Sequence, residues 1–182
     1  MIYEGTSEIL EMTIARDRWQ QHLKTSGAYY RDIARALADV PDDCGGPTAA
    51  LALECLAAVL DACRVGRLTR NQHVLLRLGE LTAYAECAGA LARRAAAAVR
   101  NALPEKADTR FTPAALAAVS RVFAREAALK VAEEGLRWVT GAATEADLAT
   151  NLPLDRVRAA QSGLLADMDR VADALYGREV RP

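Results

Sequence analysis

The chain has 182 residues, of which 52% are hydrophobic and 5% aromatic, so one domain with a sizeable core is expected, filled mainly by alanine and leucine. Small side chains of this kind favour closely packed helices. The 23 basic and 24 acidic residues leave a formal net charge of −1, which gives no electrostatic reason to expect a nucleic acid or another polyanionic partner.

The first part of the chain predicts three helices and one firm break. Apolar residues at helical spacing predict a helix over residues 7–23 and a second over residues 28–40. Residues 41–47, Pro-Asp-Asp-Cys-Gly-Gly-Pro, end the second helix and form the clearest linker in the chain. Pro47 suits the first turn of a third helix, which we expect to end near Arg67.

The rest of the chain predicts three further helices. A fourth helix should cover residues 72–103, and the proline that follows ends it. Thr112 followed by Pro113 predicts an N-cap with proline at the first helical position, opening a fifth helix that ends at Gly141. Pro153 opens the last helix, which has a stripe expected to face the bundle, formed by Val157, Ala160, Leu164, Met168, Val171 and Leu175.

No stretch of useful length shows the alternation of a β-strand. The sequence therefore predicts an all-α fold, an antiparallel helical bundle of about six helices. The apolar stripes are interpreted as core, without a role in binding a cofactor.

The cysteines and histidines give no metal-binding pattern. No Cys-x-x-Cys pair is present, and the six residues of these types are Cys44, Cys55, Cys63, Cys87, His22 and His73. Cys55 and Cys63 lie on one predicted helix and are expected to be buried as small apolar residues, which favours a reducing, cytoplasmic compartment. No segment has the length and apolarity of a membrane span, and the start has no signal-peptide pattern.

One stretch, at the start of the chain, points to chemistry. Glu4 and Gly5 precede Thr6 and Ser7, so a carboxylate lies on a flexible turn just ahead of the free backbone N–H groups of a helix. Such a turn suits a catalytic acid or base. It equally suits an ordinary helix start, with Thr6 as the N-cap and Glu4 favoured by the helix dipole.

The run Ile-Tyr-Glu-Gly-Thr-Ser-Glu-Ile at residues 2–9, continued by Ile-Ala-Arg at residues 14–16, resembles the signature near the end of the catalytic core of acyl-CoA dehydrogenases. These FAD-dependent enzymes desaturate acyl-CoA thioesters. The resemblance implies the following roles: Glu4 as the base that removes the substrate's α-proton, Gly5 as a substrate contact, and Thr6, Ser7 and Glu8 as FAD contacts. A glutamate can do this only where a water-poor site raises its pKa and a flavin takes the hydride.

The resemblance also implies how the chain is divided. Residues 1–40 would be a remnant of the C-terminal catalytic domain, residues 41–47 a linker, and residues 48–182 a helical C-terminal extension. Residues 77–84, Arg-Leu-Gly-Glu-Leu-Thr-Ala-Tyr, loosely resemble the extension of the very-long-chain branch. The chain departs from the family at Glu11, where that branch commonly has arginine, so a basic contact at that position is not expected.

The family builds its FAD and acyl-CoA sites from two further domains, and electron-transfer flavoprotein is the implied electron acceptor. We therefore expect this chain to be a C-terminal fragment or a truncated reading frame, inactive alone and binding FAD weakly or not at all. The alternative, from another class, is a non-catalytic helical module for interaction or homo-oligomer formation.

Two further features have competing interpretations. Arg93, Arg94 and Arg100 suit contact with an anionic membrane surface, which is associated with the extension in very-long-chain relatives. Acidic residues upstream favour a solvated face instead. The two tryptophans, Trp19 and Trp138, suit a partner surface or buried packing, and packing is favoured.

Overall fold

The computed structural model describes residues 6–142 and 148–178. These residues form eight α-helices, two short 3-10 helices and no strand, which confirms the predicted all-α helical bundle. The elements in chain order are α1 (Ser7–Lys24), α2 (Ala28–Arg35), η1 (Asp42–Cys44), α3 (Gly46–Val65), η2 (Leu68–Arg70), α4 (Gln72–Val99), α5 (Pro113–Gly141), α6 (Leu148–Asn151), α7 (Leu154–Ala160) and α8 (Leu164–Leu175).

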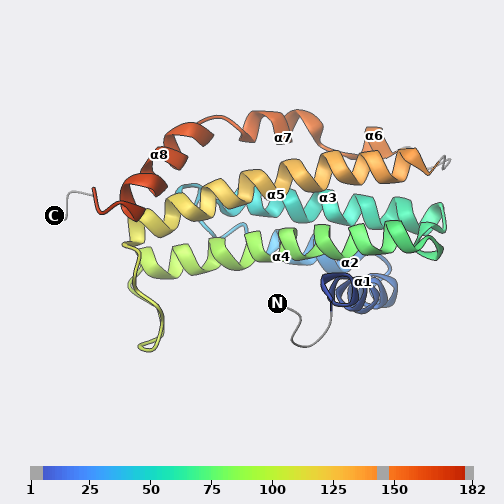
Figure 1. The fold of residues 1–182 in the computed structure, drawn as a ribbon, viewed down its shortest axis with the longest axis horizontal. Helices are drawn as coiled ribbons and strands as arrows, with labels where there is room; N and C mark the ends of the chain where they lie inside the picture. The colour runs from blue at the N-terminus through green and yellow to red at the C-terminus, as the bar shows by residue number, and fades with distance from the viewer. Residues whose placement is uncertain (1–5, 143–147, 179–182) are drawn as a thin grey trace.

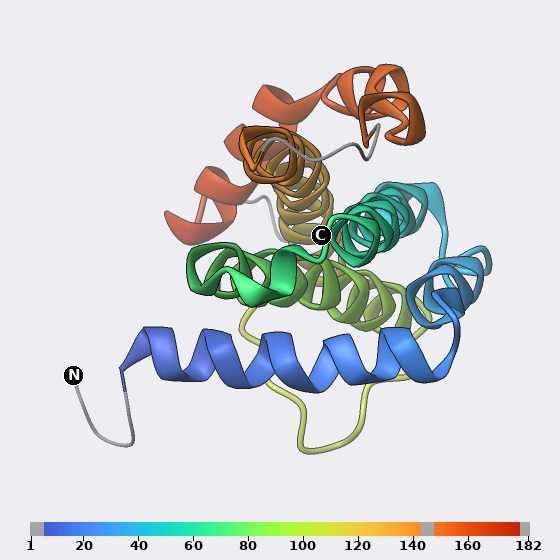
Figure 2. The same ribbon diagram turned by 90° about the vertical axis from the view of Figure 1, so that its right-hand side faces the viewer.

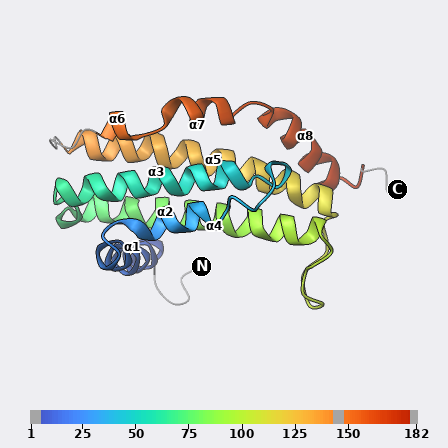
Figure 3. The same ribbon diagram turned by 180° about the vertical axis from the view of Figure 1, so that it is seen from behind.

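Three long helices, α3, α4 and α5, lie side by side and alternate in direction, and they form the centre of the molecule (Figure 1). Helix α1 is seen end-on in that view and along its length in Figure 2, where it crosses α4. From behind, α2 lies against α3, and α6, α7 and α8 follow the outer side of α5 (Figure 3). Thus α1, α2 and α8 are peripheral helices on a three-helix centre.

The core is built mainly from alanine and leucine, as the composition predicts. Alanines line the inner faces of α4 and α5 and are almost completely buried, including Ala85, Ala88, Ala92, Ala95, Ala124, Ala127 and Ala128. Where α1 crosses α4 the backbones approach so closely that a Cβ atom on Gly79 would lie 2.1 Å from the Glu11 carbonyl oxygen. Small residues therefore set the distances between these helices.

Two helix starts follow directly from local side-chain chemistry. The Asn71 side chain accepts hydrogen bonds from the backbone N–H groups of His73 (3.0 Å) and Val74 (3.4 Å), which opens α4. The Thr112 hydroxyl accepts one from the Ala115 N–H at 3.1 Å, so the predicted N-cap of α5 is confirmed.

The predicted linker, residues 41–47, is a packed connection. Its 3-10 turn ends in the buried residues Cys44, Gly45 and Gly46. The Ser120 hydroxyl of α5 donates a hydrogen bond to the Cys44 carbonyl oxygen at 2.8 Å. The guanidinium of Arg121 donates a hydrogen bond to the carbonyl oxygen of Asp43 in the same turn. The segment is thus fixed against α5, although the division of the chain at this point stays a prediction.

The prediction of one long last helix was wrong. Helices α7 and α8 are separated by a turn in which Gly163 has φ +81°, a left-handed conformation that favours glycine. The expected inward stripe is broken with it, because Val157 is buried whereas Met168 is 39% and Leu175 66% exposed. The residue of α8 that points inward is Asp167, 3% exposed, and its polar contacts decide which face of the helix is buried.

Candidate functional site

Three of the five predicted site residues lie at the exposed start of α1. Glu4 and Gly5, the predicted base and substrate contact, lie outside the described residues. Thr6 is the N-cap residue of α1, with extended backbone angles (φ −74°, ψ 159°). Ser7 and Glu8 form the first turn of the helix, and all three side chains are exposed. The structure therefore brings the three predicted FAD contacts together on one helical turn.

The Thr6 side chain does not cap the helix. It accepts no hydrogen bond from a backbone N–H group, so the expected capping contact is absent. The pKa of Glu8 lies below its usual value, first because of its own backbone N–H group and second because of the Thr6 hydroxyl. The first turn thus presents a carboxylate that favours the ionised form.

Apolar side chains follow directly on the same exposed turn. Ile9 and Leu10 are each 55% exposed, whereas Ala15 further along α1 is 3% exposed. Figure 2 shows this end of α1 projecting past the neighbouring helices. The start of α1 is therefore an amphipathic surface open to solvent.

The middle of α1 is fixed to the bundle by one carboxylate. Arg18 Nε lies 2.6 Å from Glu86 Oε1 of α4, and the Tyr30 hydroxyl of α2 donates to the same oxygen at 2.8 Å. Tyr30 is completely buried. Burial, and next the charge of Glu86, raise the pKa of this phenol, and the hydrogen bond to Glu86 raises the pKa of Arg18. Glu86 thus joins three helices.

A groove of about 660 Å³ lies between α1 and α4. Charged and small side chains line it, and Cys87 contributes the one thiol that is exposed among the described residues. Its charged residues are Arg16, Asp17, Arg18 and Glu86, of which the last two are already paired with each other. The groove adjoins α1, the helix that begins with the acyl-CoA-dehydrogenase-like residues Thr6, Ser7 and Glu8. Its paired groups Arg18 and Glu86 hold α1 against α4.

A second hollow, of about 580 Å³, lies between α2, α3 and the segment that leads into α7. Its charges are balanced within the protein. Arg156 Nη1 lies 2.7 Å from Glu54 Oε2, and the Arg31 guanidinium is paired with Asp61. Because each carboxylate already has its own arginine, this arrangement stabilises the packing of these helices and offers no unpaired charge to a ligand.

A buried histidine lies behind this hollow, and the sequence analysis assigned it no role. His22 is completely buried, and its Nε2 lies 3.2 Å from Asp61 Oδ1. Its ring stacks on Trp19 with the centroids 5.6 Å apart. One sequence signal was available, because His22 follows the buried Ala15 by seven residues and so lies on the same face of the helix.

Asp167 of α8 was also missed. Its side chain is 5% exposed and is surrounded by arginines, with Arg125 Nη1 at 2.7 Å and Arg170 Nη1 at 3.0 Å. Arg121 makes a further ion pair, and its hydrogen bond is the main reason that the pKa of Asp167 is far below the usual range. These contacts clamp α8 onto α5. No local pattern pointed to them, since Asp167 lies 46 residues from Arg121.

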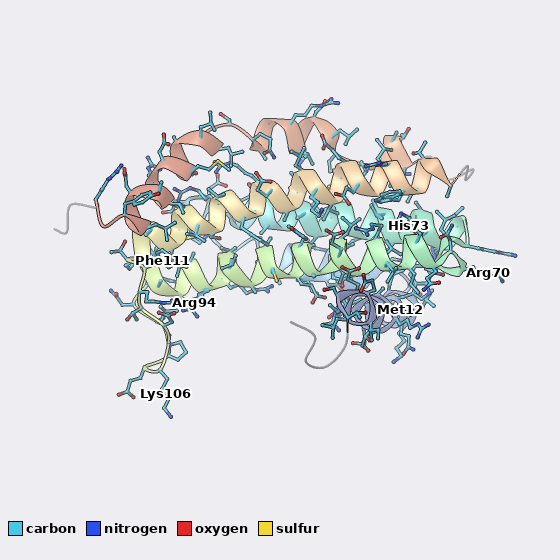
Figure 4. The ribbon with its side chains drawn as sticks, in the orientation of Figure 1. Met12, Arg70, His73, Arg94, Lys106 and Phe111 are labelled. Carbon is cyan, nitrogen blue, oxygen red and sulfur yellow. The ribbon has the colours of Figure 1, made fainter. Side chains whose placement is uncertain are left out.

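The basic residues near the end of α4 are partly occupied by the protein itself. Arg94 Nη2 donates to the Asp108 carbonyl oxygen at 2.8 Å. Asp108 belongs to the loop between α4 and α5, in which Figure 4 labels Lys106. Arg100 Nε donates to the Ala96 carbonyl oxygen at 3.2 Å. Neither contact supplies a membrane-binding pattern.

The two tryptophans are partly buried, and both pack against other rings. Trp138 contacts His73 edge-on at 4.5 Å between ring centroids, and Trp19 is the residue that stacks on His22. The expected packing role is therefore the one observed.

Among the described residues no group of three or more metal-ligating side chains occurs. Cys55 and Cys63 are buried and free, as predicted, and burial raises the pKa of each thiol to about 12. None of the described helices combines the length and the apolarity that crossing a membrane requires.

Comparison with models of protein families, with curated proteins and with solved structures found no match to this chain.

Proposed function

We propose that this chain is the C-terminal part of a flavin-dependent acyl-CoA dehydrogenase, with an acyl-CoA thioester as substrate and electron-transfer flavoprotein as electron acceptor. The observation that carries the proposal is the start of α1. There the three residues that correspond to FAD contacts, Thr6, Ser7 and Glu8, occupy one exposed turn. The apolar residues that follow them are exposed as well, as expected of a surface that another domain covers.

The residues present fit one edge of a flavin site. Hydroxyls and free backbone N–H groups at a helix start suit the polar parts of FAD. FAD, when bound, supplies the acceptor for the hydride that leaves Cβ of the substrate. Within this chain Glu4 takes the α-proton on its carboxylate, so that the two hydrogens lost in forming the α,β double bond leave as a proton and a hydride.

The same turn explains why the chain alone should be inactive. A carboxylate acts as a strong base toward a thioester only where water is excluded. Thr6 and Ser7, two and three residues after the proposed base, are exposed. Three contact residues also give little binding energy against the cost of immobilising a large cofactor. We expect the purified chain to be colourless. A yellow protein with stoichiometric flavin would contradict this expectation.

The test is Glu4→Gln in the full-length enzyme. The amide keeps the shape of the side chain, so flavin content should stay nearly unchanged while flavin reduction by acyl-CoA falls by several orders of magnitude. A lost helix-end charge is worth only about 0.3–1 kcal/mol, less than the roughly 1.36 kcal/mol that changes a rate tenfold. Glu11→Gln, the same substitution seven residues further along the chain, is the control. A Glu4→Gln rate within about tenfold of the unmodified enzyme would show that Glu4 is structural.

A second candidate function is a non-catalytic module for interaction or self-association. It is supported by α8, whose large outward side chains Leu165, Met168, Leu175 and Tyr176 are 76%, 39%, 66% and 74% exposed. Their spacing places them on one side of the helix. Sedimentation equilibrium should then show oligomers that Leu165→Ser with Leu175→Ser dissociates, while the exposed Ala166→Ser does not.

A further inference from the structure

The end of α1, the turn after it and the start of α2 converge on a single carboxylate of α3. Asp61 Oδ1 lies 3.2 Å from His22 Nε2 of α1, and Arg31 of α2 pairs with the other carboxylate oxygen. Arg64, on α3 itself, lies 3.9 Å away. We call these four residues the Asp61 cluster. It is separate from the Glu86 contacts that hold the middle of α1.

The turn between α1 and α2 is packed tightly against the same carboxylate. Gly27 has φ +86°, and its N–H donates to the His22 carbonyl oxygen at 2.8 Å. A Cβ atom at this position would lie 2.9 Å from Asp61 Oδ1. Arg31 Nη1 in turn donates to the Gly27 carbonyl oxygen at 2.7 Å. The Gly27 turn therefore has little room to change its conformation while it packs against Asp61.

His22 is the least hydrated member of the cluster. Its ring is completely buried, Nδ1 has no hydrogen-bond partner among the described residues, and the Nε2 contact with Asp61 lacks hydrogen-bond geometry. A neutral ring leaves one N–H and one acceptor nitrogen unpaired. A protonated ring would bury a second N–H with no acceptor and add a positive charge.

The charges that face His22 act on that extra proton in both directions, and burial is the main effect that opposes it. Asp61 of α3 attracts it, whereas Arg64 of α3 and Arg31 of α2 repel it. Within α1 the ring contacts the uncharged Trp19. The hollow between α2, α3 and α7 is lined by Arg31 and Asp61, so solvent protons reach the outer side of the cluster without any unfolding.

We propose that His22 is a proton-operated latch: the neutral ring keeps the junction of α1 and α2 seated on α3, and its protonation releases that junction. The ion pair of Arg18 with Glu86 then still holds the middle of α1, so the opening is local to residues 19–31. This device changes how freely the motif-bearing helix moves, and it does not depend on the flavin assignment.

The pKa of His22 supports the direction of the effect. Burial lowers it below the ordinary value, and the attraction of Asp61 opposes burial without cancelling it. A histidine whose folded pKa is depressed contributes full stability above the pKa of the unfolded chain, about 6.5. That stability is lost as the pH falls below this value, because the unfolded state binds the proton first.

The experiment measures hydrogen exchange by mass spectrometry at pH 7.5 and 5.5, after correction for the intrinsic pH dependence of exchange. The chain as it stands should lose protection over residues 19–31 at the lower pH, while the centre of α4 and α5 keeps it. His22→Gln, which cannot be protonated, should show no such pH-dependent loss. The control is His73→Gln, because His73 is exposed and is the other histidine of the chain. It should behave as the unmodified protein does.

A second measurement keeps the test valid if His22→Gln does not fold. The imidazole NMR signals of the unmodified chain come from two residues, and the spectrum of His73→Gln assigns them. His22 should titrate below about 6.5, the value of a histidine in an unfolded chain, over the pH range in which protection is lost. A His22 midpoint at or above that value would overturn the proposal. So would acid-induced opening that persists unchanged in His22→Gln.

Discussion

Two peripheral parts of this bundle, the α1–α2 junction and α8, are each held on the central helices by contacts around one buried ionisable group. The chemistry of the two groups is opposite. At the α1–α2 junction a completely buried imidazole, His22, lies beside one carboxylate and two arginines. At α8 a buried carboxylate, Asp167, is surrounded by three arginines. The first arrangement favours a neutral buried group, because burial lowers the pKa of His22, and the second favours a charged one, because the arginines lower the pKa of Asp167. If the proposed latch is right, the ionisable group buried beneath each of these peripheral helices sets how the helix responds to pH.

The largest expected effect is the loss of the α8 clamp. Asp167→Ala leaves Arg121 and Arg125 without their carboxylate while both are largely buried, and removing one partner of such a pair costs about 3 kcal/mol. Denaturant unfolding should show the loss, and hydrogen exchange should place it in α8. The exposed neighbour Asp169→Ala should change stability by less than about 0.5 kcal/mol. A clamp variant whose α8 stayed protected would show that apolar contacts hold this helix.

A matched pair of glycines compares the two junctions directly. Gly27 (φ +86°) precedes α2 and Gly163 (φ +81°) precedes α8. Gly27→Ala should cost about 2 kcal/mol, because left-handed strain of about 1 kcal/mol is joined by the close contact with Asp61. Gly163→Ala meets only Arg125 Nη2, at 3.6 Å, so about 1 kcal/mol of strain remains. Thermal unfolding of both variants checks the order, and equal losses would show that the Gly27 turn is not tightly packed.

As the pH is lowered, the α1–α2 junction and α8 should lose their stability in a fixed order. The α1–α2 junction should loosen first, from about pH 6.5 downward, because the pKa of His22 is depressed below that of the unfolded chain. One group changes the free energy of unfolding by at most about 1.4 kcal/mol per pH unit. The α8 clamp should persist to far lower pH, because arginines hold the pKa of Asp167 far below normal. Exchange at stepwise lower pH checks this, and release of α8 first would reverse the comparison.

The smallest expected effect is at the second attachment of α1. Tyr30→Phe removes the hydroxyl that donates to Glu86, but Arg18 still pairs with this carboxylate. The loss should be about 1 kcal/mol, as for one ordinary hydrogen bond. Tyr29→Phe, on the same helix and partly buried, is the control. A Tyr30→Phe loss no larger than that of the control would mean that Arg18 alone seats α1.

The sequence alone determined the elements that depend on near neighbours. The start of α5 at Thr112 and Pro113 and the first helix from Ser7 were predicted because caps and helical periodicity act within about one turn of the chain. The alanine-rich core followed from composition. The placing of Thr6, Ser7 and Glu8 at a helix start was predicted in the same way, whereas their role with FAD remains a proposal.

The tertiary structure alone decided which faces and which ionisable groups are buried. The stripe from Val157 to Leu175 was expected to face inward, yet Asp167 takes that position because Arg121 and Arg125 lie more than 40 residues away in sequence and beside it in space. His22 meets Asp61 in the same manner, from a different helix. Hydrophobic periodicity reports only the pattern of apolar side chains along one helix. The free energy of burying a charge or an imidazole depends on the groups that distant helices place against it, and folding brings these together.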